Sequence, residues 1–548
     1  KLRNSTLKFT IVQKIKTKIS QRLSKLNDNL FLLQKYVYNS GMNFKRNLFV
    51  ITSALVGALA LSGCDLGGPK PFSHFNFIET PEDKHERIVG DGYVKIGEYE
   101  DFKVKGSEEE PLNYGSAYEV FRDHAGNSNI PSLGEQKMIV VPVAFEDYGV
   151  DKLNLTEAQY IENINKVFFG NNKNNEYVSV GEYFNKSSYG KLKLDGKVCD
   201  KIYTFPLTIS KIKESKQKRE VLATEYYKKV LDWYKENYDD LQDYEVEGLK
   251  TGKNVPIYMV YTYPSEEKTD DDQENFFWAY TFSETPLSWS SYSFSTTSYE
   301  LPDSHTYIHE TGHLLGLTDY YPTLAAKKEE TVVIDPTSFI DMMDASVGDE
   351  TGFSKMYLNW TRPTYITNNC TVTIKSFTET GDLLLLANDW NETVFDEYYL
   401  IEFYTPTGLN TYDVSVGNNL AKLPKVPGIK IYHVDARLAY VSTNRTPLAY
   451  CSDEEFKPLN YNVGFAHDNN TYDEPNEFQK NYLYQLILNN SKVDQTFCAT
   501  DANFFRAGDK IPTLKFNKGG EFGFEISIDL LEFARSIITF KKTQKNVK

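Results

Sequence analysis

The 548-residue chain has only five cysteines, eight histidines and six methionines, and its basic side chains are fewer than its acidic ones. Five cysteines are too few for a disulfide-rich scaffold of this length. The formal net charge of −16 makes nucleic acid an unfavourable partner, because phosphate binding needs a basic surface. A content of 40% hydrophobic and 25% charged residues excludes a disordered chain and a polytopic membrane protein. The length corresponds to about two to four folding units.

The N-terminal region has the order of a secretory signal peptide. From Met42 a short basic segment leads into the 16-residue run LFVITSALVGALALSG, which is followed by Cys64. This run is shorter than the roughly 20 residues that span a bilayer, and it ends in small residues, as signal peptides do. Leu61-Ser62-Gly63-Cys64 resembles a bacterial lipobox. The sequence therefore predicts a lipoprotein signal peptide at residues 42–63 and a lipid on Cys64; the alternative is an uncleaved N-terminal anchor.

Residues 1–41 carry nine basic side chains and one acid. We expect them to be upstream sequence translated from a gene start placed too early, with a genuine basic extension as the alternative. Without residues 1–63, 49 basic and 75 acidic groups remain, a net charge of −26. Anionic lipid would repel such a chain, so membrane attachment is expected through the lipid on Cys64. The expected location is extracytoplasmic, on a bacterial cell surface, where up to two disulfides can form among Cys199, Cys370, Cys451 and Cys498.

The remaining chain divides by pattern. Residues 64–135 are interpreted as a tether and a small N-terminal segment. Apolar runs at 138–145 and 255–261 are typical of buried strands, and Thr156 with Gln159 predicts a capping box for a helix that ends near Gly170. A second helix is predicted over residues 215–238. These alternating elements predict a mixed α/β domain at 136–365.

Short β-rich runs separated by turn residues follow, at 371–374, 383–386, 398–404, 429–434 and 522–528. This spacing predicts an all-β, sandwich-like C-terminal domain at 366–540. The expected fold is therefore α+β or mixed α/β followed by a β-domain.

The chemically most informative segment reads HETGHLLGLTD, from His309 to Asp319. On a helix His309 and His313 lie one turn apart on the same face, so both imidazoles can bind one metal ion. Glu310 lies beside them, where it can contact a water on the metal. Gly316 can adopt a positive φ and reverse the chain, which returns Asp319 as a carboxylate ligand. Two imidazoles, a carboxylate and an open position suit catalytic zinc; the alternative is a surface helix with incidental histidines.

At this point the sequence resembles the M6 family of metallopeptidases, the group that includes immune inhibitor A. The similarity spans most of residues 137–530. It includes the HExxHxxGxxD motif, VGEYF at 180–184, SSYGKL at 187–192, FSKMYLNW at 353–360, YLIE at 399–402 and GIKIYHVD at 428–435. Thr318 departs from the expected pattern, which has proline there. The resemblance implies a metzincin-like zincin catalytic domain at 136–365 and peptide-bond hydrolysis.

The segment Phe339-Ile340-Asp341-Met342-Met343-Asp344 is similar to the Met-turn of metzincins, which forms a hydrophobic floor beneath the zinc ligands. This resemblance implies a supporting role for Met343, with Met342 as the second choice. Ordinary core packing is the alternative.

Several other polar groups are weaker candidates. His305 lies four residues before His309 and can contact substrate or metal. His433 and Asp435 lie on one side of a strand, where a structural hydrogen bond is favoured over a second metal site. Asp270-Asp271-Asp272 and Glu274 can attract a structural Ca²⁺, although a solvated acidic loop is favoured. Residues 288–298 are interpreted as a loop beside the cleft.

The sequence therefore predicts a lipid-anchored, extracytoplasmic zinc endopeptidase, expected to be a monomer, that acts on proteins or peptides. Zn²⁺ is held by His309, His313 and Asp319, and Glu310 is the general base. A surface binding or adhesive lipoprotein on the same scaffold is one alternative. A zinc amidase acting on non-protein substrates is another.

Overall fold

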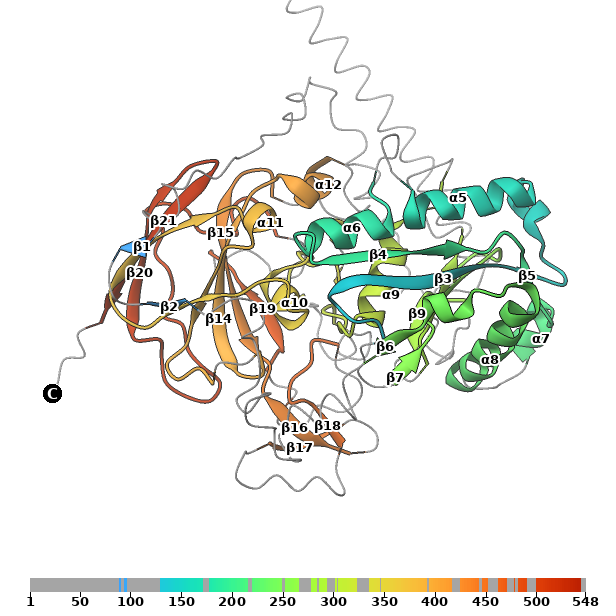
Figure 1. Ribbon diagram of the computed structural model, residues 1–548. Coiled ribbons are helices and arrows are strands. Elements are labelled where there is room, and N and C mark those ends of the chain that lie inside the picture. The colour runs from blue at the N-terminus through green and yellow to red at the C-terminus, as the bar shows by residue number, and fades with distance from the viewer. Residues whose placement is uncertain are drawn as a thin grey trace, which may run out of the picture. The chain divides into compact units, whose positions relative to one another are not determined.

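The computed structural model describes residues 88–89, 93–95, 129–170, 177–214, 219–248, 252–265, 277–282, 285–292, 301–302, 304–322, 335–344, 346–391, 394–415, 424–442, 446–451, 462–470, 478, 481–489 and 499–543. All of them belong to one compact unit, Glu79–Lys548. They combine several sheets with comparatively few helices (Figure 1). The predicted mixture of α and β structure is therefore confirmed at this level.

A largely parallel sheet organises the first part of the described chain. Its strands lie in the order β4 (Leu192–Val198), β3 (Gly134–Phe145), β8 (Ile257–Tyr261), β10 (Leu287–Ser291) and β9 (Tyr280–Phe282), and β5 (Tyr203–Phe205) also pairs with β3. The pairs β3-β4, β3-β5, β3-β8 and β8-β10 are parallel. The edge strand β9 runs antiparallel to β10. A small hairpin, β6 (Val246–Gly248) and β7 (Gly252–Asn254), lies outside this sheet.

Helices cover both faces of the parallel sheet. Met138 and Val140 of β3 share one hydrophobic core with α5 (Glu157–Phe169), α6 (Val180–Ser187) and α9 (Ser304–Leu314). Ile139 and Val141 share the opposite core with α7 (Ile209–Glu214) and α8 (Arg219–Asn237) (Figure 1). Because alternate residues of a strand point to opposite faces, a strand that is covered on both sides reads as one continuous apolar run.

The two predicted helices are present. Thr156 Oγ1 accepts a hydrogen bond from Gln159 N at 3.2 Å, and Gln159 Oε1 accepts one from Thr156 N at 2.9 Å, which is the predicted capping box. Helix α5 ends at Phe169, directly before Gly170. The helix predicted over residues 215–238 is α8, and its Leu222 and Tyr226 are buried.

Two antiparallel sheets dominate the second part. One has the order β19 (Tyr484–Ile487), β15 (Gly428–Asp435), β14 (Glu397–Tyr404), β13 (Leu383–Leu386), β11 (Thr364–Ile366) and β2 (Tyr93–Lys95), with one parallel pair between β11 and β13. The other has the order β1 (Ile88–Val89), β12 (Cys370–Lys375), β21 (Arg535–Lys542) and β20 (Phe524–Leu531). Side chains of both sheets line one hydrophobic cluster, so the sheets pack face to face.

The second part contains further elements beyond these strands. A third, small sheet has the order β17 (Pro447–Tyr450), β16 (Leu438–Val441) and β18 (Asn462–Phe465). The short helices are α10 (Gly352–Tyr357), α11 (Phe377–Thr380) and α12 (Thr411–Ser415), and a 3-10 turn lies at Gly408–Asn410; two other 3-10 turns, Val150–Leu153 and Leu241–Tyr244, belong to the first part. Residues 366–540 are therefore not purely β, because α11 and α12 lie within them.

Two short strands precede the parallel sheet in sequence. β1 pairs antiparallel with β12, and β2 pairs antiparallel with β11. Both lie in the segment that the sequence presents as a tether. Their backbone hydrogen bonds attach this segment to both antiparallel sheets, a long-range pairing that local sequence does not reveal.

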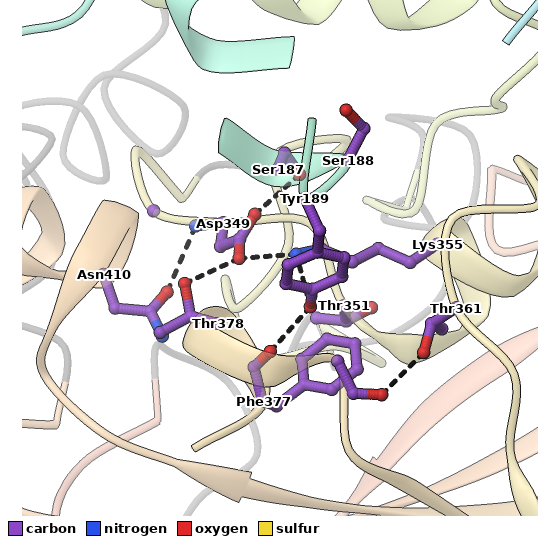
Figure 2. Close-up of polar contacts among 12 residues, drawn as sticks. Ser187, Ser188, Tyr189, Asp349, Thr351, Lys355, Thr361, Phe377, Thr378 and Asn410 are labelled. Carbon is purple, nitrogen blue, oxygen red and sulfur yellow. Dashed lines mark hydrogen bonds and ion pairs between the residues drawn. The ribbon is translucent and has the colours of Figure 1, made fainter. Parts of the chain in front are cut away.

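A buried ion pair links α10 to the segment that directly precedes it. Lys355 Nζ lies 2.6 Å from Asp349 Oδ2, and the two side chains are 0% and 3% exposed. The Asp349 carboxylate also accepts hydrogen bonds from Ser187 Oγ at 2.6 Å and Thr378 Oγ1 at 2.7 Å (Figure 2). Tyr189 OH accepts a further bond from Lys355 Nζ at 3.0 Å. The pair is therefore completed by donors and acceptors from two other segments of the chain, residues 187–189 and α11.

Two sequence expectations are wrong. Cys199 and Cys370 are buried and form no disulfide. The four cysteines that could have formed two disulfides, Cys199, Cys370, Cys451 and Cys498, therefore do not form both. Burial raises the pKa of the Cys199 thiol to about 12, which keeps it protonated. Residues 288–291 belong to strand β10 rather than to a loop. Serine is buried there because its hydroxyl is satisfied: Ser290 Oγ lies 3.0 Å from Tyr258 OH.

Several expectations lie outside the described residues. They are the segments 1–41 and 42–63, the lipidation site Cys64, Cys498, and the acidic group Asp270-Asp271-Asp272 with Glu274. Within the part of the chain that the structure describes, no helix is long and apolar enough to cross a membrane.

Candidate metal centre

Helix α9 presents the two predicted histidine ligands. His309 and His313 are one turn apart, and their ring centroids lie 4.9 Å from each other with the ring planes at 90°. The opposite face of the helix is buried against the parallel sheet and residues 339–344, including Tyr307 and Ile308 at 0% exposure. The apolar face therefore fixes the helix in place, and the two imidazoles stay partly exposed at 12% and 19%.

A reversal after the helix brings the third predicted ligand back. Gly316 has a φ of +100°, a conformation that side-chain-bearing residues rarely adopt. Leu317 N then donates to Gly312 O at 3.1 Å, which closes the turn. Asp319 Oδ1 lies 3.0 Å from His309 Nε2 and 3.2 Å from His313 Nε2. Gly316 is thus located at the predicted hinge.

These three side chains form the one group of three or more potential metal-ligating residues within the described residues. Their ligand atoms all lie within 4.8 Å of one another. The other ring nitrogens are already engaged: His309 Nδ1 lies 3.0 Å from Met342 O, and His313 Nδ1 lies 2.9 Å from Leu317 O. A carbonyl oxygen only accepts, so each Nδ1 carries a proton and donates.

This tautomer decides what the cluster can hold. A neutral imidazole with its proton on Nδ1 presents the Nε2 lone pair to Asp319, whose carboxylate also has only lone pairs. Positive charge must therefore lie between them, either as protons on the imidazoles or as a cation. Two Nε2 atoms and a carboxylate oxygen, with both imidazoles oriented by backbone carbonyls, match the ligand set and the outer shell of a zinc site. The residues present fit the predicted ion.

The electrostatics of the cluster follow from the same contacts. Burial favours the neutral form of His313, but the neighbouring Asp319 carboxylate outweighs it and raises the pKa of His313 to about 9. Burial also opposes ionisation of Asp319, yet the two histidines hold its pKa well below the usual range. The carboxylate is therefore ionised and suited to bind a cation.

Glu310, the predicted general base, is held by a residue that the sequence did not indicate. Glu310 is 5% exposed, and its Oε2 accepts a hydrogen bond from Thr281 Oγ1 of strand β9 at 2.8 Å. Its Oε1 has no hydrogen-bond partner among the described residues. Burial raises the pKa of Glu310, and the two histidines and Thr281 partly oppose that shift. Of the two carboxylate oxygens, Oε2 is therefore anchored and Oε1 is not.

The two predicted methionines lie beneath α9. Met342 and Met343 are both 0% exposed. Met342 contributes the backbone carbonyl that orients His309. Met343 packs against the helix between the two histidines, because a Cβ added to Gly312 would lie only 2.5 Å from Met343 Sδ. Both methionines therefore lie against the turn of α9 that carries the histidines, Met342 through its carbonyl and Met343 through its sulfur.

The weaker candidates do not join this cluster. His305 Nε2 lies 3.0 Å from Ser346 O. His433 Nε2 lies 2.8 Å from Glu397 Oε1, and Asp435 Oδ1 accepts a hydrogen bond from Arg437 Nε at 2.7 Å. These are structural polar contacts of the antiparallel sheets. They agree with the favoured structural interpretation of this pair.

Two contacts of the site come from residues that carried no motif. Thr281 lies in a three-residue strand, and Asn470 donates from Nδ2 to Asp319 Oδ2 at 3.0 Å across 151 positions of sequence. A run of Asp and Asn at 468–470 is an ordinary turn signal, so it gave no indication of this role. No family model matches the chain, and no curated protein matches it.

Proposed function

We propose that the chain is a zinc-dependent endopeptidase of the M6 type, with a metzincin-like catalytic region. The observation that carries this proposal is the convergence of His309, His313 and Asp319 next to Glu310. Among the described residues, the Glu310 carboxylate is hydrogen-bonded to a side chain through Oε2 alone. Lipid attachment at Cys64 and an extracytoplasmic location remain part of the proposal and rest on the sequence pattern alone.

A bound zinc ion would supply Lewis acidity, which polarises the scissile carbonyl and acidifies a water. The protein's part is positioning and proton transfer. Thr281 holds Glu310 Oε2 at 2.8 Å, so Oε1 is the atom that accepts the proton from the attacking water and delivers it to the leaving amine. The raised pKa of Glu310 suits this exchange, because a base acts best near the working pH.

The position of the edge strand β9 favours the proposal that the substrate is a polypeptide. Thr281 in this strand contacts Glu310, while no described strand pairs with the other edge of β9. An extended peptide that adds to a free edge makes main-chain hydrogen bonds without regard to its side chains. Such a peptide would pass directly beside the general base.

The test combines metal analysis with cleavage of a proteome-derived peptide library and of cell-wall fragments. Wild-type protein should hold about one zinc per chain and cleave peptides, and a chelator should abolish cleavage until zinc is restored. Glu310→Gln should keep the zinc and lose about 10²- to 10⁴-fold in cleavage rate. Glu162→Gln is the matched control, because Glu162 is an exposed acid of α5 that pairs with Lys166.

Absence of stoichiometric zinc would refute the proposal, and so would full activity of the Glu310→Gln protein. Cleavage of cell-wall fragments but not of peptides would favour the amidase alternative. Zinc binding without hydrolysis of either would favour a binding protein.

A further inference from the structure

Asp319 has two carboxylate oxygens with different surroundings. Oδ1 faces both imidazoles, at 3.0 and 3.2 Å from their Nε2 atoms. Oδ2 accepts a hydrogen bond from Asn470 Nδ2 at 3.0 Å. Asn470 belongs to the turn after strand β18, so a distant part of the chain contacts the outer side of the candidate metal centre.

The turn that carries Asn470 is itself held in place. Asn470 N donates to Asp468 Oδ1 at 2.9 Å. The adjacent Asn469 donates from Nδ2 to Tyr320 O at 3.1 Å and to Tyr484 O at 2.7 Å, and its Oδ1 accepts from Tyr484 N at 3.1 Å. Tyr320 directly follows Asp319, so the same turn makes hydrogen bonds both to the backbone beside Asp319 and to the Asp319 side chain.

Chemistry fixes the orientation of the Asn470 amide. The Asp319 carboxylate only accepts, so the nitrogen of Asn470 must face it. Asn470 is 3% exposed, and its Oδ1 is buried without a partner among the described residues. A buried amide that satisfies only one end is unfavourable for folding. Its contact with Asp319 is therefore better explained as a hydrogen bond that orients the carboxylate than as a contact that stabilises the turn.

The hydrogen bond from Asn470 orients the Asp319 carboxylate. With Oδ2 tied to Asn470, rotation of the carboxylate is restrained and Oδ1 stays turned toward both Nε2 atoms. Residues that orient a metal ligand from outside commonly change metal affinity when removed, although they never touch the ion.

We propose that Asn470 is a positioning residue of the metal centre, acting through Asp319, so that the region after β18 completes the site. This inference rests on the proposed function, because it requires a metal ion bound by Asp319.

The test measures zinc affinity of the full chain by competition with a chromogenic chelator. Asn470→Ala should weaken zinc binding about 10- to 100-fold. Asn489→Ala is the matched control, because Asn489 Nδ2 makes the same kind of contact with a carboxylate, Asp509 Oδ2 at 2.7 Å, outside the cluster. The control should leave zinc affinity unchanged.

A double-mutant cycle with Asp319→Ala separates positioning from a general structural effect. If Asn470 acts through Asp319, Asn470→Ala should cause no further loss of affinity in the Asp319→Ala background. If Asn470→Ala does not give folded protein, Asn470→Ser serves instead, because its shorter side chain is polar but cannot reach Oδ2.

Unchanged zinc affinity in a folded Asn470 variant would overturn the inference and leave the proposed function intact. Additive losses in the cycle would also overturn it. A wild-type protein that binds no zinc would instead refute the proposed function itself, so the two failures are distinguishable.

Discussion

Substitution Lys355→Met tests the buried ion pair that joins α10 to its surroundings (Figure 2). The Lys355 side chain is 0% exposed and its Nζ lies 2.6 Å from Asp349 Oδ2. Methionine keeps the length of the side chain and removes the charge, which leaves the Asp349 carboxylate buried beside Glu350 without its counter-ion. Burial already raises the pKa of Glu350, and Asp341 raises it further. A further uncompensated negative charge in this region is therefore energetically unfavourable.

The expected cost is about 3–5 kcal/mol, the usual result of removing one partner of a buried pair. The hydrogen bonds from Ser187 and Thr378 to Asp349 remain and favour the lower part of that range. Since a folded domain is stable by about 5–15 kcal/mol, the loss is readily measured. Urea unfolding followed by tryptophan fluorescence is the assay.

Lys186→Met is the matched control. Lys186 pairs with Glu182 at 2.7 Å on the surface of α6, with 49% and 32% of the two side chains exposed. Its loss should cost about 0.5 kcal/mol or less. Adding Asp349→Asn to Lys355→Met should recover part of the stability, because it removes the stranded charge. A Lys355→Met protein that loses less than about 1 kcal/mol would refute the electrostatic argument.

Three further predictions concern other parts of the fold. Gly312→Ala should destabilise the protein by a net amount of about 1–2 kcal/mol, because the new Cβ overlaps with Met343 Sδ. This net loss includes a gain of about 1 kcal/mol in helix propensity. Unchanged urea unfolding would contradict this packing. Burial raises the pKa of Asp413 to about 7, so its stabilising effect is complete below about pH 4 and is lost as the pH rises through about 7. Asp413→Asn should make the free energy of unfolding less dependent on pH across that window, and an unaltered pH profile of urea unfolding would count against the shift. Thr156→Ala should cost about 1 kcal/mol through loss of the capping box, measured in the same way, and a neutral result would argue against the cap.

Local signals in the sequence predicted much of the local structure. The capping box at Thr156 and the apolar run of β3 depend on residues close together in the chain, and both occur as expected. The spacing of His309 and His313 depends on helix geometry alone, so their shared face followed directly. The positive φ at Gly316 is likewise a property of one residue and its turn.

Long-range contacts were not predictable in this way. Serines of β10 were interpreted as loop residues because their polarity suggests exposure, whereas a buried hydroxyl and a backbone carbonyl satisfy them. The pairing of β1 with β12 joins residues almost 300 positions apart, and no local pattern encodes it. Thr281 and Asn470 reach the site from segments without any motif.

The sequence by itself determined the types of the candidate metal ligands, their spacing and the turn that returns Asp319, because helix periodicity and glycine conformation act over a few residues. Only the tertiary structure decided which backbone carbonyls fix the imidazole tautomers, which hydroxyl anchors Glu310 and which amide holds Asp319. Those partners meet only when the sheet edge, residues 339–344 and the segment after β18 pack around α9. Their positions are set by burial and hydrogen bonding summed over the whole fold.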